Sequence, residues 1–325
     1  MAKLNLVQAI NLAMHEEMAS NPDVLVLGQD VGQDGGVFRA TDGLLEKFGE
    51  KRVIDTPLAE AGILGTAIGM SLAGLKPIAE IQFDGFSYTV FNQLEGHASR
   101  FRTRSQGKWT VPLVLRFPYG GGVRALEHHS EARESFYAFP GLKVVVPSGP
   151  RNARALLTAA IRDPDPVVFL EPKRSYRAFK EEVPDTPEVM DIGKAQVVQE
   201  GSDLTLISWG AMMRPVLSAV AEVKEKTGAS IELIDLLTIS PLDAETIATS
   251  VKKTGRAVVV QESPKSFGAA SEVIARINDE VLMYLEAPVK RVTGFDVVTP
   301  YFGREAGYIP EVSRIVAGIE ETLKF

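Results

Sequence analysis

The sequence predicts an α/β protein made of two doubly wound domains, each built on a parallel sheet. Short runs of Val, Ile and Leu alternate with helix-length segments along the chain, which is the pattern of repeated βα units. The predicted strands are apolar throughout, as expected when helices cover both faces of a sheet. At 325 residues the chain has the usual length for two domains, each large enough to bury a core.

We expect the first domain to span residues 1–180 and the second to span 192–325, with a polar, proline-containing linker at 181–191. In the first domain an amphipathic helix at the N-terminus precedes predicted strands at 24–28, 52–54, 77–83, 112–117, 143–148 and 167–172, and helices follow at 87–104, 131–139 and 152–162. In the second domain strands are predicted at 204–210, 231–236, 257–263 and 289–295, and helices at 212–227, 243–254, 267–285 and 310–323.

The composition is that of an ordinary soluble globular protein, with 45% hydrophobic and 24% charged residues. A net charge of −7 argues against nucleic acid or an anionic membrane as the main partner. The absence of cysteine excludes disulfides, thiolate metal sites and a cysteine nucleophile. No signal-peptide pattern and no apolar run long enough to span a bilayer is found, so we expect a cytoplasmic protein without a membrane partner.

The stretch at 52–70, RVIDTPLAEAGILGTAIGM, is the most informative part of the first domain. Thr56 is a suitable N-cap and Pro57 suits the first helical position, so a helix is predicted to start there and to be buried on most sides. The only charged residue of this predicted helix is Glu60. Two interpretations of Glu60 remain open: a carboxylate that complements the helix dipole, or a desolvated carboxylate that exchanges a proton with a bound ligand.

A glycine-rich loop that carries two histidines is the second notable feature. GGGVRA at 120–125 formally satisfies a dinucleotide-binding pattern, but no strong helix follows it and no acidic residue stands where a ribose would need one. We therefore expect a flexible loop that brings His128 and His129 to a ligand. A metal site is weakly supported, since neither the HExxH spacing nor any cysteine is present.

Together these segments resemble the beta subunit of the thiamine-diphosphate-dependent component of 2-oxo acid dehydrogenase complexes, of pyruvate or branched-chain type. The resemblance covers essentially the whole chain in order. It rests on GQDVGQDGGVFRATDGL (28–44), DTPLAEAGILGTAIGMSLAGLKPIAEIQF (55–83), PLVLRFPYGGGV (112–123), HHSEARESFYAFPGLKVVVPS (128–148), AAIRDPDPVVFLEPKRSYR (159–177) and PYFGREAGYIPEV (300–312). It implies a transketolase-like pyrimidine-binding domain followed by a transketolase C-terminal-like domain.

The resemblance also implies roles for individual residues. Glu60 would hydrogen-bond a ring nitrogen of the cofactor's aminopyrimidine and share a proton with it. Leu58 would pack near the cofactor, and Gln82 and Phe86 would line the aminopyrimidine pocket. His129 would face the reaction centre and pass a proton during acyl transfer to the lipoyl disulfide, a role that suits an imidazole.

The partners follow from what the chain lacks. It has no Gly-Asp-Gly motif with a later asparagine, the arrangement that holds Mg²⁺ and the diphosphate in complete thiamine enzymes. The resemblance therefore implies an alpha subunit that holds Mg²⁺ and shares the thiamine diphosphate, in a particle of two alpha and two beta chains. The second domain would dimerise and dock the lipoyl-bearing acyltransferase core through that core's subunit-binding domain. A structural K⁺ is implied near Leu113, Ala160, Ile161, Asp163 and Asp165.

Some alternatives stay open on the sequence alone. The chain could be the beta subunit of an acetoin dehydrogenase, take part in a transketolase-like transfer, or be a non-catalytic scaffold. Gln29, Thr89 and Asn92 stand where relatives often carry acids. A path of acidic side chains that would carry protons between the paired active sites of the assembled particle is therefore in doubt. The sequence does not decide between pyruvate and branched-chain 2-oxo acids.

Overall fold

The computed structural model describes residues 1–325 and divides into two compact units. The first unit comprises Met1–Tyr119 and Phe136–Ile192, and the second comprises Gly120–Ser135 and Gly193–Phe325. The segment that carries both histidines thus belongs to the second unit. Whether the units fold as separate domains with the expected boundaries stays a prediction.

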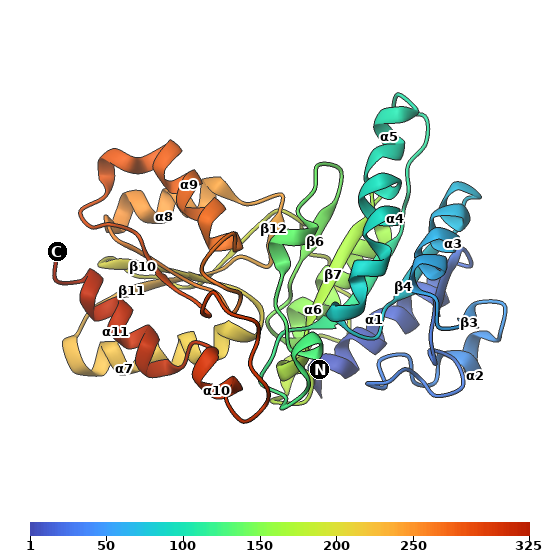
Figure 1. Ribbon diagram of the computed structural model, residues 1–325, viewed down its shortest axis with the longest axis horizontal. Coiled ribbons are helices and arrows are strands. Elements are labelled where there is room, and N and C mark those ends of the chain that lie inside the picture. The colour runs from blue at the N-terminus through green and yellow to red at the C-terminus, as the bar shows by residue number, and fades with distance from the viewer. The chain divides into compact units, whose positions relative to one another are not determined.

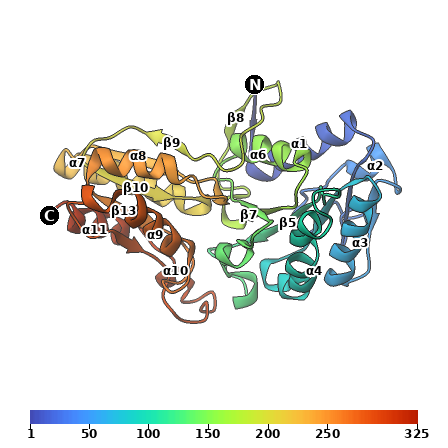
Figure 2. The same cartoon turned by 90° about the horizontal axis from the view of Figure 1, so that it is seen from above.

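The first unit is built on a parallel sheet with strand order β6-β7-β5-β4-β2-β3. Its central strands are buried at nearly every position, which fits cover on both faces. Helices α1 and α6 lie on one side of the strands, and α3 and α4 lie on the other (Figure 2). The predicted α/β fold class is confirmed. The strands are β2 (Val24–Gly28), β3 (Val53–Asp55), β4 (Lys76–Glu80), β5 (Val114–Tyr119), β6 (Lys143–Val145) and β7 (Val167–Pro172).

Ion pairs fix helix α1 (Leu6–Ser20) against helix α6 (Pro150–Arg162). Arg154 lies 2.6 Å from Glu16, and Arg162 lies 2.7 Å from Glu17. Arg154 is buried, so its pair with Glu16 contributes more to orientation than an exposed pair would. The other helices are α2 (Leu44–Phe48), α3 (Glu60–Leu72), α4 (Phe91–Gly96) and α5 (Phe101–Arg104), and a small ribbon pairs β1 (Ala2–Leu4) with β8 (Glu181–Val183).

The second unit contains a sheet with strand order β14-β13-β10-β11-β9, parallel except at β9. Helices α8 and α9 cover one face, and α7 and α11 cover the other (Figure 1). None of the helices in either unit has the length and apolar character needed to cross a bilayer. The elements are β9 (Gln196–Gln199), β10 (Leu204–Ser208), α7 (Met213–Thr227), β11 (Ile231–Asp235), β12 (Thr238–Ser240), α8 (Ala244–Thr254), β13 (Ala257–Val260), α9 (Ala269–Val281), β14 (Lys290–Val292), α10 (Glu305–Tyr308) and α11 (Val312–Thr322).

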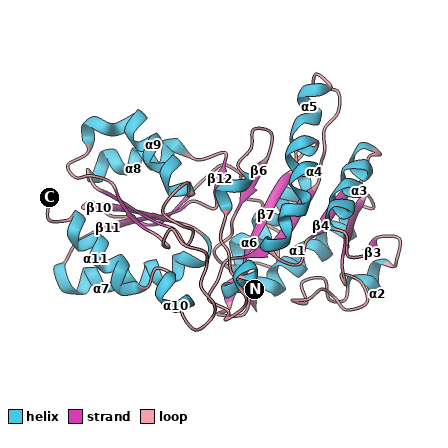
Figure 3. Ribbon diagram, viewed as in Figure 1, coloured by secondary structure: helices cyan, strands magenta, loops and turns pink.

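Two predicted helices differ from the expectation (Figure 3). The segment expected at 87–104 is helical but irregular: a 3₁₀ segment at Asp84–Val90, α4, a 3₁₀ turn at Ala98–Arg100 and α5 follow one another. The expected helix at 131–139 is reduced to a 3₁₀ turn at Glu134–Tyr137. Both segments are rich in aromatic side chains, whose tertiary packing overrides a weak local helix propensity.

Candidate functional site

Glu60 is the first residue of helix α3, at the carboxyl edge of the first sheet. The predicted cap is wrong: the N-cap is Ala59, it makes no side-chain hydrogen bond, and Pro57 lies before the helix. The reason is that the backbone N–H of Thr56 still donates to the Gly28 carbonyl at 2.9 Å, so the chain continues to follow β2 and starts the helix later. Glu60 is half-buried, and its carboxylate makes no hydrogen bond or ion pair within the chain.

Helix α3 is less buried than expected. Its buried residues lie on one face and are Ile63, Leu64, Ala67, Ile68 and Ser71. Gly62 and Gly69 are exposed, and a Cβ atom added at Gly69 would meet nothing within 4 Å. Leu58, just before the helix, is 81% exposed. The prediction of burial on most sides is therefore wrong for this chain by itself.

Gln82 and Phe86 follow strand β4 at the same sheet edge. The Gln82 amide donates to the Asp30 carboxylate at 2.9 Å, so this polar side chain has the hydrogen-bond partner that its position requires. Phe86 is half-buried and packs edge-to-face on Phe83, with ring centroids 5.8 Å apart. Both residues lie where open α/β sheets bind ligands, beyond the carboxyl ends of the strands.

A buried ionic network lies beneath this edge and was missed from the sequence. Arg116 on β5 forms two parallel hydrogen bonds with Glu171 on β7, at 2.6 and 2.9 Å. Arg116 also donates to Glu80 at the end of β4, and the Tyr176 hydroxyl donates to Glu171. All four side chains are at most 4% exposed. The sequence signal for this network is one charged residue inside each of three otherwise apolar strands, PIAEIQF, PLVLRF and VVFLEP.

The network is held together by charge in a dry environment. Burial raises the pKa of Glu80, while the Arg116 guanidinium opposes that shift. Burial also tends to lower the pKa of Arg116, but Glu171 and Glu80 outweigh it and the net direction is upward. Burial and the nearby Glu171 carboxylate raise the pKa of Tyr176 well above its usual value. Arg116 therefore stays charged and ties three strands together at the edge that carries Gln82.

The histidines lie in a single 3₁₀ turn, Glu127–His129, within the second unit. Their ring centroids are 4.2 Å apart, and both side chains are half-buried. His128 Nδ1 lies 3.5 Å from the Glu127 carboxylate, so His128 contacts an acidic side chain of its own turn. The chain contains no group of His, Cys, Asp or Glu side chains that could hold a metal ion, so the weakly supported metal site at the paired histidines has no ligand set.

Glu134, just after this turn, is a buried acid that should make stability depend on pH. It is 1% exposed, and the Trp209 indole N–H donates to it at 2.9 Å. Burial raises the pKa of Glu134 to about 7, although the Trp209 hydrogen bond opposes this. A glutamate in the unfolded chain titrates at about 4.3, so folding becomes less favourable as pH rises through the interval up to 7.

Glu134→Gln should remove this penalty and keep an oxygen that accepts from Trp209. We expect the free energy of unfolding of the variant, relative to the parent, to increase between pH 4.5 and pH 8 by up to about 3 kcal/mol. Denaturant unfolding at several pH values measures this difference. A difference that stays constant with pH would contradict the assignment.

The residues expected around a potassium ion gather where α6 ends and β7 begins. Two of their oxygen groups already face cations of the chain: Lys143 pairs with Asp163 at 2.6 Å, and Arg102 pairs with Asp165 at 2.7 Å. The Lys76 ammonium also donates to the Ile161 carbonyl at 3.4 Å, and the carbonyls of Leu113 and Ala160 accept backbone N–H groups. This donor set fits K⁺ poorly as arranged, so the potassium site stays a prediction.

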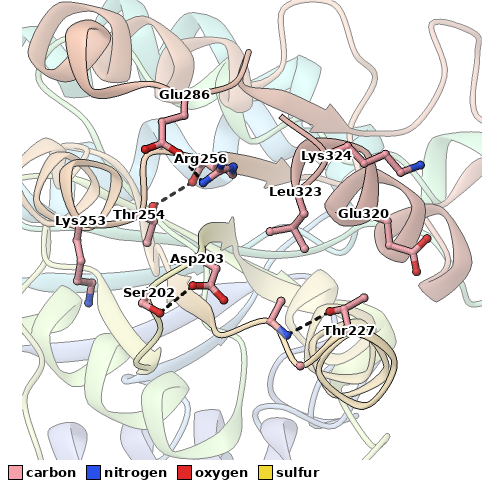
Figure 4. Close-up of a pocket in the computed structure, with 12 residues that line it drawn as sticks. Ser202, Asp203, Thr227, Lys253, Thr254, Arg256, Glu286, Glu320, Leu323 and Lys324 are labelled. Carbon is pink, nitrogen blue, oxygen red and sulfur yellow. Dashed lines mark hydrogen bonds and ion pairs between the residues drawn. The ribbon is translucent and has the colours of Figure 1, made fainter.

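A pocket of about 700 Å³ opens in the second unit, lined by charged and polar side chains (Figure 4). Its charges are largely satisfied: Arg256 lies 2.6 Å from Glu286, and Ser202 donates to Asp203 at 2.9 Å. None of the predicted site residues lines it. We therefore do not place the chemistry there.

The residues at the first sheet edge fit an aminopyrimidine. The Glu60 carboxylate lies at the start of an apolar helix without a partner in its own chain, as required for a group that binds a ring nitrogen. The exposed side chain of Leu58 and the edge of Phe86 supply apolar surface for a heterocycle.

Comparison with known proteins identifies two domain families along the chain. Residues 2–178 match the family model of the transketolase pyrimidine-binding domain, and residues 193–315 match that of the transketolase C-terminal domain. A pyruvate dehydrogenase E1 component subunit beta from Acholeplasma laidlawii is 53% identical over 100% of this chain and 99% of the relative. The protein of that name from Bacillus subtilis (strain 168) is 49% identical over 100% of both chains. A solved structure titled as a split-gene transketolase, inactive beta4 tetramer, has a TM-score of 0.82 at 22% identity over 99% of both chains, and supports the fold alone.

Proposed function

This chain belongs to the family of beta subunits of the thiamine-diphosphate-dependent component of 2-oxo acid dehydrogenase complexes, and from that premise we propose that its substrate is pyruvate. The high identity over full length to relatives named for pyruvate dehydrogenase favours pyruvate over branched-chain acids. A reconstituted enzyme should therefore turn over pyruvate faster than 3-methyl-2-oxobutanoate. The observation that carries the chemistry is the unpartnered Glu60 carboxylate at the start of α3.

Thiamine diphosphate supplies the nucleophilic carbon for decarboxylation when it is bound. Glu60 would hold a proton at a ring nitrogen of the aminopyrimidine, while Leu58, Gln82 and Phe86 would orient that ring. Since Glu60 is only half-buried here, the water that surrounds it must be excluded by the cofactor and a partner chain. His129 would pass a proton when the acyl group moves to the lipoyl disulfide.

The partner is an alpha subunit, which would hold Mg²⁺ and the diphosphate. Supporting this, α3 presents an exposed glycine face and Leu58 is 81% exposed, both suited to close contact with another chain. We further propose a particle of two alpha and two beta chains that docks the acyltransferase core through acidic surface on the second unit. Asp279, Glu280 and Glu286 are exposed there beside exposed Met283.

The direct test is reconstitution. This chain alone, and an alpha subunit alone, should neither bind thiamine diphosphate tightly nor decarboxylate pyruvate, whereas the mixture should do both. The mass of the mixture, measured with and without the acyltransferase core, tests the stoichiometry and the docking. Activity of the isolated chain, or an inactive mixture, would overturn the proposal in favour of a different activity or a scaffold.

His129→Ala should separate the catalytic role from a scaffold role. We expect acyl transfer to a lipoyl domain to fall by about 10²–10⁴-fold, the usual contribution of a positioned proton donor, while affinity for thiamine diphosphate is retained. Coupled turnover and cofactor titration of the reconstituted enzyme measure the two quantities. His97→Ala is the matched control, because His97 is exposed and lies outside this loop. Acyl transfer unchanged in His129→Ala would rule out the role.

A further inference from the structure

Buried carboxylates of the second unit hold the backbone of the glycine loop that leads to His129. Glu305, the first residue of α10, is 2% exposed. One of its carboxylate oxygens accepts the N–H of Gly122 at 2.7 Å, and the other accepts the N–H of Arg124 at 3.0 Å. The Glu262 carboxylate accepts the N–H of Gly121, the residue before Gly122. Hydrogen bonds thus join the C-terminal segment that contains Glu305 to the triple-glycine loop.

The backbone of the loop is shaped to make these contacts. Gly120 and Gly122 have φ values of +81° and +82°, which turn successive N–H groups toward the carboxylates. A Cβ atom added at Gly121 would lie 2.6 Å from Glu305 Oε1, so only glycine permits the approach. The loop closes where the Gly120 N–H donates to the Glu131 carbonyl at 2.7 Å, so the turn with His129 lies inside the closed segment.

The geometry points to Glu305 as a positioning residue for acyl transfer, which fixes His129 by binding the backbone amides of Gly122 and Arg124. This rests on the proposed role of His129. A carboxylate that accepts two N–H groups forms stronger hydrogen bonds than a neutral acceptor. Because each oxygen has its own donor, a side chain with one acceptor oxygen cannot replace it.

Glu305→Gln is the test variant, since it keeps the shape but turns an NH₂ group toward one of the backbone donors. In the reconstituted enzyme we expect the kcat of lipoyl-domain acylation to fall by about 10–100-fold, as a misplaced catalytic group does, with the KM for the lipoyl domain and thiamine diphosphate affinity unchanged. Hydrogen exchange of the peptide covering residues 120–126 should be faster in the variant. The control is Glu321→Gln, which removes an exposed acid paired with Lys290 and should change neither quantity.

Glu305→Asp covers the case in which the glutamine variant does not fold. It keeps the charge and both acceptors but is one methylene shorter, so intermediate acylation and intermediate exchange are expected. The double variant with His129→Ala should be no slower than His129→Ala alone. Unchanged exchange at 120–126 in both Glu305 variants, or unchanged acylation alongside an impaired His129→Ala, overturns the inference. If His129→Ala itself leaves acylation intact while exchange is faster in Glu305→Gln, the proposed role of His129 fails and the contact stands.

Discussion

Replacing Glu60 by glutamine is expected to lower pyruvate decarboxylation by the reconstituted enzyme by about 10²–10⁴-fold. Glutamine keeps the size of the side chain and a hydrogen-bonding amide, but it cannot hold and return a proton. The carboxylate has no other task within the chain, since it makes no hydrogen bond or ion pair there and does not cap the helix. Stability of the isolated chain should therefore change little. Decarboxylation with an artificial electron acceptor measures the first effect, and thermal unfolding measures the second.

The matched control is Glu46→Gln. Glu46 also lies in the first turn of a helix, α2, and is exposed, so its replacement removes the same favourable interaction with a helix dipole. If Glu60 served only the dipole, the two variants would behave alike and decarboxylation would stay within a few-fold of the parent. That result would exclude the catalytic role of Glu60.

The fold class and the placement of Gln82 at the sheet edge follow from the sequence because they depend on local patterns. Continuous apolar strands separated by helix-length segments are sufficient to indicate parallel sheets with helices on both faces. The carboxyl ends of such strands form the edge at which α/β sheets bind ligands, so the position of Gln82 after an apolar strand predicts that it lies there, where it donates to Asp30. The role proposed for Glu60 does not follow from pattern alone and rests on the family resemblance.

What the sequence could not give depends on contacts between distant segments. The start of α3 shifts because Thr56 pairs with Gly28 of another strand, which no cap motif reveals. Glu305 lies far along the chain from Gly122, and only the folded second unit shows that they bind. The charges in the apolar strands were visible, but their mutual pairing depends on strand order, which propensity does not fix.

Replacing Arg116 by methionine is expected to destabilise the chain by about 3–5 kcal/mol, the usual effect of leaving a buried charge without its partner. Methionine fills a similar volume, so the loss of stability comes from the Glu171 and Glu80 carboxylates, which are left without their cation, and not from a cavity. Part of it should be recovered as pH falls. Burial already raises the pKa of Glu80, and without Arg116 that group is neutralised more easily in the folded state than in the unfolded one. Denaturant unfolding at pH 8 and pH 5.5 measures both effects.

Arg100→Met is the control for this variant, because Arg100 pairs with Glu95 at 3.1 Å on the surface and should contribute no more than about 1 kcal/mol. Arg116→Lys keeps the charge but loses the paired hydrogen bonds to Glu171, so its unfolding free energy should lie between those of the parent and Arg116→Met. Equal stability of Arg116→Met and Arg100→Met would show that the network contributes little. Glu80 ends the strand that leads to Gln82, so a change at Arg116 could also disturb that edge of the sheet. If Arg116→Met is less stable but still binds thiamine diphosphate normally with the alpha subunit, the network stabilises the sheet without shaping that edge.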